Sequence, residues 1–378
     1  MRSLSEVEAL PADYLTDIEK YFKETLNNLY NGKKPTNKMF TTSGKTLVDK
    51  AVESYGTVQL DFTTPDAQML SQLVKNCWQF SAAKNYQELQ DLSAAMVNNE
   101  TGKLREWSDF KAEAEKIGKK FNETWMRTEY DQAITGAQSA ARWVEFEQDA
   151  DTIPNLQYQT VGDGFVRTEH QLLNGVVRPL KDGFWNTNYP PNGWGCRCEA
   201  LQVPNDLGEI TPAENVPNIS IAPMFRTNLA KTGLIFPNEH PYYKGIPREI
   251  QQTLDVEVKR AVNVHYREIV EKWASNNIKG IQIHELDTFY SGKMEISGKS
   301  VETIARHLSG FNKTIAVNVI ENIDKWERLN NNVGLKHARK DFVDFNNYKI
   351  KLADKEYIIH VGITKNGNEV LHSVFDIK

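Results

Sequence analysis

Two cysteines and one histidine have the residue types and the spacing needed to hold a metal ion. Cys196 and Cys198 are separated by one residue, and His170 precedes them in the same segment. Alternate residues of a strand face the same side, so a strand would direct both sulfur atoms toward one ion, with the imidazole as a third ligand. These three residues could therefore share a structural zinc ion. The alternative is a pair of buried thiols beside a hydrogen-bonded histidine, because structural zinc usually has four ligands in Cys-x-x-Cys knuckles.

The C-terminal part of the chain gathers a second set of residues that could transfer protons. Residues 275–378 hold five of the eight histidines, together with 15 basic and 13 acidic residues, which gives a net charge of +2. The other 274 residues carry 30 basic and 37 acidic residues, a net charge of −7. The overall charge of −5 therefore excludes a wholly basic nucleic-acid binder, but the C-terminal part could meet an anionic partner.

The composition is that of an ordinary globular protein. The 378 residues are 40% hydrophobic and 25% charged, which suggests two or three domains. No stretch approaches the ~20 apolar residues of a membrane span, and the N-terminus lacks the apolar core of a signal peptide, so we expect neither a membrane span nor Sec export. Three cysteines cannot form a disulfide framework, which favours a reducing compartment.

Four segments must position these residues, and together they predict an α+β fold. Residues 1–99 carry apolar residues at helical spacing and are expected to form a helical N-terminal region. Residues 100–203 continue one helical stripe and then become rich in Gly, Pro, Trp and Cys, which predicts a small irregular α+β module. Residues 204–274 hold seven of the 14 prolines and are interpreted as a proline-rich arm followed by a helix. Residues 275–378 predict helices followed by an antiparallel β-meander.

The elements of the last segment follow from local signals. We expect helices at 298–309 and 315–330, the first with Ser297 as its N-cap. Three β-rich runs come next, and Asn366-Gly367-Asn368 is a hairpin-turn signal between the last two. The expected strands are Tyr348–Leu352, Tyr357–Thr364 and Val370–Ile377.

A dense run of special residues lies between positions 158 and 198, and apolar periodicity does not explain it. These residues are Tyr158, Thr160, Asp163, Val166, Arg167, His170, Gly175, Trp185 and Pro190 through Cys198. The run resembles the signature of the phage Mu F-like minor head (head morphogenesis) proteins of tailed bacteriophages and prophages. Upstream, Arg127-Thr128-Glu129 resembles the helix before that signature, and downstream residues 224–228 and 240–243 resemble its tail. The resemblance covers about 100–240.

This resemblance implies a virion protein present in few copies near the portal, with a role in head assembly or DNA delivery. Portal and head proteins are the implied partners. Nothing in the module requires catalysis. Asp163, Arg167 and His170 could form a charged cluster, for which a buried structural ion pair is the commoner outcome.

Members of this family often carry a variable C-terminal domain, and several of these resemble polymorphic toxins. In residues 275–378, the order of elements, His307, Lys336-His337-x-Arg339 and Leu371-His372-Ser373 resemble the barnase–EndoU–colicin–RelE nucleases of the phage-associated branch. This resemblance implies metal-independent RNA cleavage. Such cleavage needs a base for the 2′-hydroxyl, an acid for the leaving 5′-oxygen and cations for the phosphorane.

We therefore assign His307 and His337 as the acid/base pair, without ordering them. Arg339 and Ser373 complete the predicted catalytic residues, and Lys336 and Arg306 are predicted to bind the substrate phosphate. No cofactor is expected for the nuclease. The alternative is that the histidines are unrelated, and His360 and His372, expected on strands, have cross-strand pairing as their default role.

The sequence thus predicts a phage or prophage minor head protein with a ribonuclease-like toxin domain, located in the virion and the bacterial cytoplasm. RNA and an immunity protein are its further predicted partners. The alternative is a purely structural minor capsid or portal-associated protein whose C-terminal domain is inert. A toxin that transfers ADP-ribose ranks last, because no convincing Glu-x-Glu pair lies near an expected strand.

Overall fold

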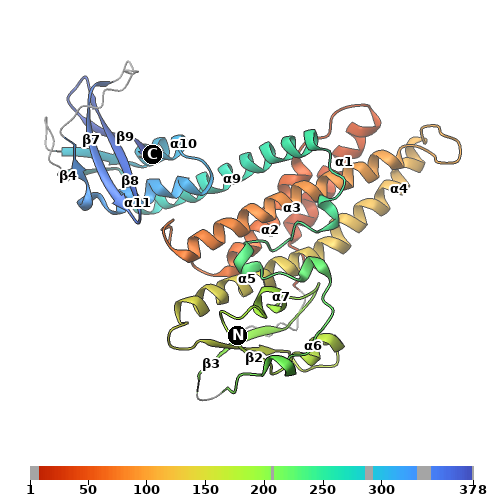
Figure 1. Ribbon diagram of the computed structural model, residues 1–378. Helices are drawn as coiled ribbons and strands as arrows, with labels where there is room; N and C mark the ends of the chain where they lie inside the picture. Colours follow the sequence, from red (N-terminus) through yellow and green to blue (C-terminus); the bar gives the residue numbers. More distant parts are fainter. Residues whose placement is uncertain (1–7, 206–207, 286–292, 330–341, 377–378) are drawn as a thin grey trace. The chain divides into compact units, whose positions relative to one another are not determined.

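The computed structural model describes residues 8–205, 208–285, 293–329 and 342–376 (Figure 1). Its contacts divide the chain into two compact units. Unit 1 comprises Met1–Thr57 and Met69–Val258, and unit 2 comprises Val58–Gln68 and Lys259–Lys378. Both helices and antiparallel sheets are present, so the predicted α+β class is confirmed.

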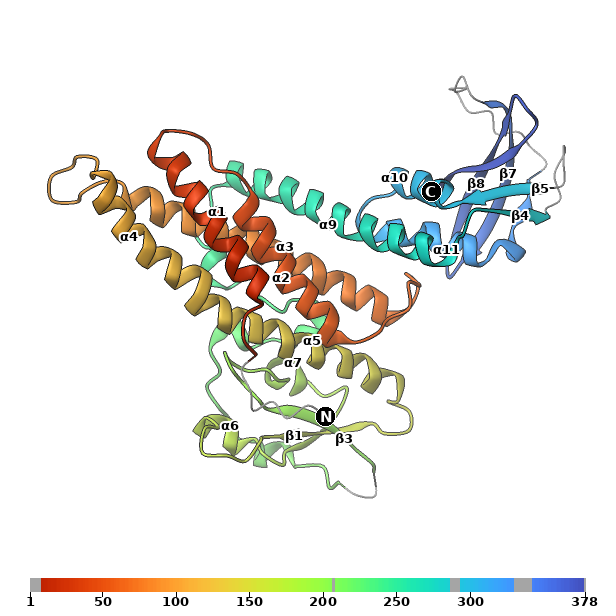
Figure 2. The same ribbon diagram turned by 180° about the vertical axis from the view of Figure 1, so that it is seen from behind.

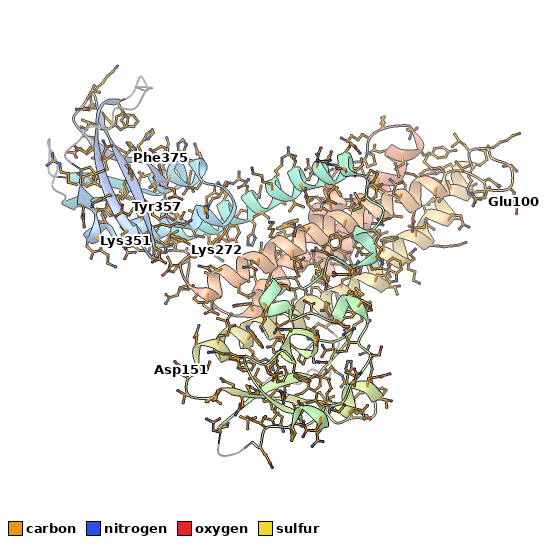
Figure 3. The ribbon with its side chains drawn as sticks, in the orientation of Figure 1. Glu100, Asp151, Lys272, Lys351, Tyr357 and Phe375 are labelled. Carbon is orange, nitrogen blue, oxygen red and sulfur yellow. The ribbon has the colours of Figure 1, made fainter. Side chains whose placement is uncertain are left out.

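Unit 1 is built mainly on long helices, as predicted for the N-terminal region. They are α1 (Ala12–Tyr30), α2 (Lys38–Tyr55), α3 (Pro65–Ala95), α4 (Trp107–Lys119) and α5 (Met126–Gln148), with a π-helical turn at Lys120–Trp125 between the last two. Figure 3 labels Glu100 in the turn between α3 and α4. Two of these helices meet closely at Gly118, where a Cβ would lie 2.5 Å from the ring of Phe22. A glycine is therefore required for α1 and α4 to pack at this distance.

A small antiparallel sheet follows α5 in unit 1 (Figure 2). Its strands, in the order β2-β1-β3, are β1 (Asn155–Gln159), β2 (Val177–Pro179) and β3 (Glu199–Val203). Two short helices, α6 (Thr168–Leu172) and α7 (Trp185–Asn188), lie in the connections. Leu156 and Tyr158 of β1 are fully buried, and Tyr158 is paired with Ala200 of β3. The sheet therefore has one apolar face, as expected of a small two-layer module.

The proline-rich residues 204–247 are irregular, as their composition predicts. Short helical turns interrupt them at Ala213–Asn215, Pro223–Phe225, α8 (Leu229–Thr232) and Pro241–Tyr243. Phe236 stacks on Phe80 of α3 at 3.8 Å between ring centroids. The Asn76 amide also donates to the Phe236 carbonyl at 3.0 Å and accepts from its N–H at 2.8 Å. This part of the interpreted arm is thus packed into unit 1.

Unit 2 contains a six-stranded sheet with the order β4-β5-β9-β8-β7-β6. Helix α9 (Arg248–Asn277) begins in unit 1 and ends in unit 2. The remaining elements are β4 (Ile281–Glu285), β5 (Lys293–Ser297), α10 (Gly298–His307), α11 (Ile315–Glu321), β6 (Glu327–Arg328), β7 (Phe342–Leu352), β8 (Lys355–Thr364) and β9 (Glu369–Asp376), with 3-10 turns at Gly310–Thr314 and Ile323–Lys325. Strands β7, β8 and β9 form the predicted antiparallel meander. Their inner face packs against α10 and α11 in one apolar core.

Unit 2 confirms one local expectation and differs from the sequence prediction at two other places. Ser297 caps α10 in a capping box with Ser300, as predicted for the N-cap. The helix expected at 315–330 ends at Glu321 and gives way to a 3-10 turn and to β6. The strands β4 and β5 were not predicted, and β5 pairs in parallel with β9. Parallel pairing joins distant parts of the chain, so no local signal indicates it.

Residues 58–68 belong to unit 2, although about 190 residues separate them from the rest of it. The Asn318 side chain donates to the Leu60 carbonyl at 2.9 Å and accepts from the Phe62 N–H at 3.4 Å. The Phe62 ring meets the buried Tyr357 edge-on, with 6.0 Å between ring centroids. This N-terminal segment is therefore part of the unit 2 core. Among the described residues, no helix is long and apolar enough to cross a membrane.

Candidate functional site

The structure brings the three predicted metal ligands together. His170, Cys196 and Cys198 each offer one ligand atom, and these atoms lie within 4.8 Å of one another. The Nδ1 atom of His170 is 3.6 Å from the sulfur of Cys196 and 3.6 Å from that of Cys198. His170 and Cys196 are buried, and Cys198 is partly exposed. A soft, shielded donor set of this kind is what zinc prefers.

The backbone before β3 places the two sulfur atoms. Gly195 has a φ of 64°, a left-handed conformation that glycine adopts without strain, and the Cys196 N–H donates to the Gly193 carbonyl at 3.0 Å. Both cysteines lie in this turn, because β3 begins only at Glu199. The sequence argument placed them on a strand, whereas a turn brings them together here.

Helix α5 holds the turn in place. The Ser139 hydroxyl donates to the Pro190 carbonyl at 2.5 Å, and the Tyr189 hydroxyl donates to the Ser139 carbonyl at 2.8 Å. Arg142 of α5 forms an ion pair with Glu199, the residue that follows Cys198. The turn is therefore fixed at both of its ends.

The shared environment shifts the pKa values of the two thiols in opposite directions. A hydrogen bond from Cys198 is the largest cause that lowers the pKa of Cys196, and bonds from His170 and from the N–H groups of Asn192 and Cys198 lower it further. The pKa of Cys198 is raised, because it shares the proton with Cys196 and is partly buried. The Cys196 sulfur is thus stabilised as a thiolate, and the thiolate is the form that binds metal.

The charged cluster expected at Asp163, Arg167 and His170 is arranged differently. Asp163 accepts two hydrogen bonds from Arg197, at 2.5 and 2.7 Å. The Arg167 side chain instead donates to the Trp194 carbonyl at 2.6 Å. Both arginines therefore brace the turn that carries the cysteines, one through a carboxylate and one through a carbonyl.

A buried polar group that the sequence argument did not single out as a site lies between α3 and α5. Lys84 forms an ion pair with Glu129, and the Tyr242 hydroxyl donates to the other oxygen of Glu129 at 2.9 Å. Glu88 accepts from the Asn122 amide at 2.5 Å, and burial raises the pKa of Glu88 to about 8. No periodic pattern marks these residues as buried, because charged side chains normally indicate an exposed face.

Beside this group is a cavity of about 460 Å³ with a mainly aromatic lining. Its walls include Trp125, Glu129, Trp194, Met224, His240 and Tyr242. Burial lowers the pKa of His240 to about 4, so this imidazole is neutral near neutral pH. Residues from three separate parts of the resemblance, near 129, 194 and 224–242, therefore meet in one place.

In unit 2, His307 lies near a second histidine that was not predicted to accompany it. Its ring centroid lies 6.2 Å from that of His372 on β9. Ser373 is buried, and its hydroxyl lies 3.1 Å from Nδ1 of His372. A bulge in β9 makes this possible, because His360 pairs with Ser373 and Val361 pairs with Leu371, which leaves His372 as the extra residue.

His360 lies on β8, where it is paired with Ser373 of β9. Its ring is 5.0 Å from that of Phe375 and 6.4 Å from that of Phe345. Burial and then the charge of His372 lower the pKa of His360 to about 4. At neutral pH, the His360 imidazole is therefore uncharged and cannot act as a general acid.

The other predicted nuclease residues have different outcomes. Arg306 is exposed and forms an ion pair with Glu302 at 3.6 Å. Lys336, His337 and Arg339 lie outside the described residues, so their assignment stays a prediction. His372 was part of the resemblance but was not assigned to the acid/base pair, because only the bulge and the end of α10 bring it to His307.

Comparison with known proteins identifies the family that part of unit 1 resembles. Residues 82–201 match the family described as Phage Mu protein F like protein. The match includes the C-terminal part of α3, all of α4 and α5, strands β1 and β2, the start of β3 and the thiol–imidazole cluster. The chain therefore carries a phage Mu F-like domain, which confirms that part of the resemblance. The matched range begins earlier than expected and leaves out the tail at 224–243.

Two curated relatives specify the likeness further. The chain is 42% identical over 73 residues to the putative capsid assembly protein F of Escherichia phage Mu, which is 19% of this chain and 17% of that protein. It is also 42% identical over 67 residues to the Mu-like prophage FluMu F protein of Haemophilus influenzae, which is 17% of this chain and 16% of that protein. The chain thus spans about a sixth of each relative. No solved structure matches it.

Proposed function

We propose that this protein takes part in head assembly of a phage or prophage, as a minor component near the portal. The observation that carries this proposal is the Mu F-like domain at 82–201, together with the relative from phage Mu whose name describes a putative capsid assembly protein. In this role the protein contacts portal and head proteins and is carried in the virion.

Purified heads provide the test of this role. The parent phage or prophage is induced with and without the gene for this chain, and heads are separated on a density gradient. We expect the chain to be present in mature heads at low copy number and its deletion to reduce the yield of filled heads. Filled heads at the normal yield that lack the chain would refute the proposal.

For unit 2 we propose metal-independent cleavage of RNA, with His307 and His372 as the described part of the acid/base group. The ring centroids of the two imidazoles lie 6.2 Å apart, and His307 is exposed at the end of α10. One imidazole removes the proton of the 2′-hydroxyl, whose oxygen bonds to phosphorus, and the other protonates the 5′-oxygen as its bond to phosphorus breaks. The products are a 2′,3′-cyclic phosphate and a 5′-hydroxyl.

The surroundings of the pair support this assignment. Arg306 lies in the last turn of α10 and is exposed, so it can exchange Glu302 for a phosphate. Ser373 orients the His372 ring through Nδ1. Phe375 is 41% exposed beside His360 and offers a face on which a base can stack (Figure 3).

The cleavage assay uses the full chain in the presence of EDTA. We expect the wild type to produce 2′,3′-cyclic phosphate ends from single-stranded RNA, and His307→Ala or His372→Ala to slow the reaction by ~10²–10⁴-fold. His265→Ala is the matched control, because His265 lies on α9 and its ring contacts Tyr266. If the wild type leaves RNA intact, unit 2 is inert and the purely structural alternative holds.

A further inference from the structure

We infer that the thiol–imidazole cluster of the Mu F-like domain binds one zinc ion, which has a structural role. The ligands are the Cys196 and Cys198 sulfur atoms and Nδ1 of His170. This inference goes beyond head assembly and RNA cleavage, and neither of these proposals depends on it.

The distances fit a tetrahedral ion. With Zn–S at ~2.3 Å and Zn–N at ~2.0–2.1 Å, tetrahedral angles place sulfur and nitrogen roughly 3.6 Å apart. Both observed separations from His170 Nδ1 are 3.6 Å. A hydrogen bond between nitrogen and sulfur can have the same length, but the equal approach of Nδ1 to both sulfur atoms is the arrangement expected of ligands that share one ion.

The cluster is also braced as a metal site requires. His170 comes from α6 and the cysteines from the turn before β3, so the ligands join two connections of the small sheet. The Cys196 N–H donates to the Gly193 carbonyl at 3.0 Å, and the Arg167 side chain donates to the Trp194 carbonyl at 2.6 Å. These hydrogen bonds hold the turn that carries both cysteines, as the groups around metal ligands generally do.

The fourth coordination position distinguishes a structural from a catalytic ion. Among the described residues, no further His, Cys, Asp or Glu joins the group. Both cysteines line a cavity of about 20 Å³ together with Ser139 and Glu199. This space holds about one water molecule and no larger ligand. A water molecule in this space would supply the fourth ligand.

The test measures metal in the full chain, purified under reducing conditions without chelator. We expect one zinc per chain by plasma mass spectrometry in the wild type and in Cys77→Ser, the matched control, since Cys77 is buried in α3 away from this cluster. Cys196→Ser, Cys198→Ser and His170→Ala should each lose the metal. The absence of stoichiometric zinc, even after incubation with zinc salt, overturns the inference, as does iron or copper in its place.

A second measurement keeps the inference falsifiable if these variants fail to fold. The wild-type chain is depleted of metal and loaded with Co²⁺ alone. Thiolate-to-cobalt charge-transfer bands with intense tetrahedral d–d bands support the site, and their absence refutes it. A mass decrease that corresponds to a Cys196–Cys198 disulfide in the reduced, freshly purified protein would also refute it, because a disulfide removes both thiolate ligands.

Discussion

Lys84 and Glu129 form an ion pair inside the Mu F-like domain, with side-chain exposures of 2% and 4%. Burying two charges is costly, and the pair compensates for this cost only while both partners are present. Tyr242 adds a hydrogen bond to Glu129, so the pair also connects α3 and α5 to the segment after α8.

Removing one partner of this pair should therefore destabilise unit 1 strongly. We expect Lys84→Met to lower the free energy of unfolding by ~3–5 kcal/mol, because it leaves a buried carboxylate without its cation. The exposed pair of Lys45 with Asp49 supplies the control, and Lys45→Met should cost at most about 1 kcal/mol. Urea titration followed by tryptophan fluorescence measures both. The double variant Lys84→Met/Glu129→Leu should be more stable than Lys84→Met alone, and a less stable double variant would contradict this explanation.

Glu88 should make stability depend on pH. Its folded pKa of about 8 lies above the value of about 4.3 for an unfolded chain. Between these values the unfolded chain has lost a proton that the folded chain retains, so the free energy of unfolding falls as the pH rises. Glu88→Gln imitates the protonated side chain and should remove this decrease.

The readout is the difference between wild type and Glu88→Gln, measured from pH 5 to pH 8.5. The groups that act on the Glu88 carboxyl include Lys84, Asn122, Glu129 and Asp91, and all are unchanged in the variant. We expect equal stability near pH 5 and a more stable variant near pH 8. Glu115→Gln, at an exposed position of α4, serves as the control. A variant that is equally stable at both pH values would show that Glu88 is ionised in the folded protein.

Removing the proposed zinc should loosen one part of unit 1. The ligands join α6 to the turn at 193–198, so these segments lose a common attachment when the ion is chelated. We expect faster amide hydrogen exchange within 163–198 after chelation, while the amides of α2 keep their protection. Mass spectrometry of peptides from both regions measures this. Unchanged exchange in 163–198 would mean that hydrogen bonds alone hold the turn.

The N-terminal segment 58–68 should contribute to the stability of unit 2. We expect Phe62→Ala to lower it by on the order of 2 kcal/mol, less than the ~3–5 of a fully buried phenylalanine, because Phe62 is only partly buried. Hydrogen exchange of the β8 amides measures this loss of stability. Phe165→Ala, at a side chain that is 89% exposed in unit 1, is the control. No change in β8 would mean that residues 58–68 lie on unit 2 without stabilising it.

Local signals in the sequence sufficed for much of this fold. Ser297 indicated the start of α10, and the Asn366-Gly367-Asn368 turn indicated the hairpin of β8 and β9. The strands β4 and β5 were missed, because the parallel pairing of β5 with β9 depends on contacts far apart in the chain.

The sites were predictable to different degrees. His170, Cys196 and Cys198 were identified from residue type and proximity, and they do converge. The partner of Asp163 was not predictable, because Arg197 is 34 positions away along the chain and reaches Asp163 from the turn at Gly195. His372 was not assigned to the nuclease site, because the β9 bulge that places it beside His307 leaves no mark in the sequence.

The inclusion of Leu60 and Phe62 in the core of unit 2 limits how this protein can exchange its C-terminal part in evolution. A recombination event that replaced only residues 259–378 would leave the Phe62 ring without Tyr357 and the Leu60 carbonyl without Asn318. The incoming domain would also lack the segment that packed against its core in its original protein. A successful exchange must therefore bring two separate stretches of gene, or an incoming domain whose surface accepts the existing segment. Residues 58–68 and 259–378 are therefore expected to be inherited together.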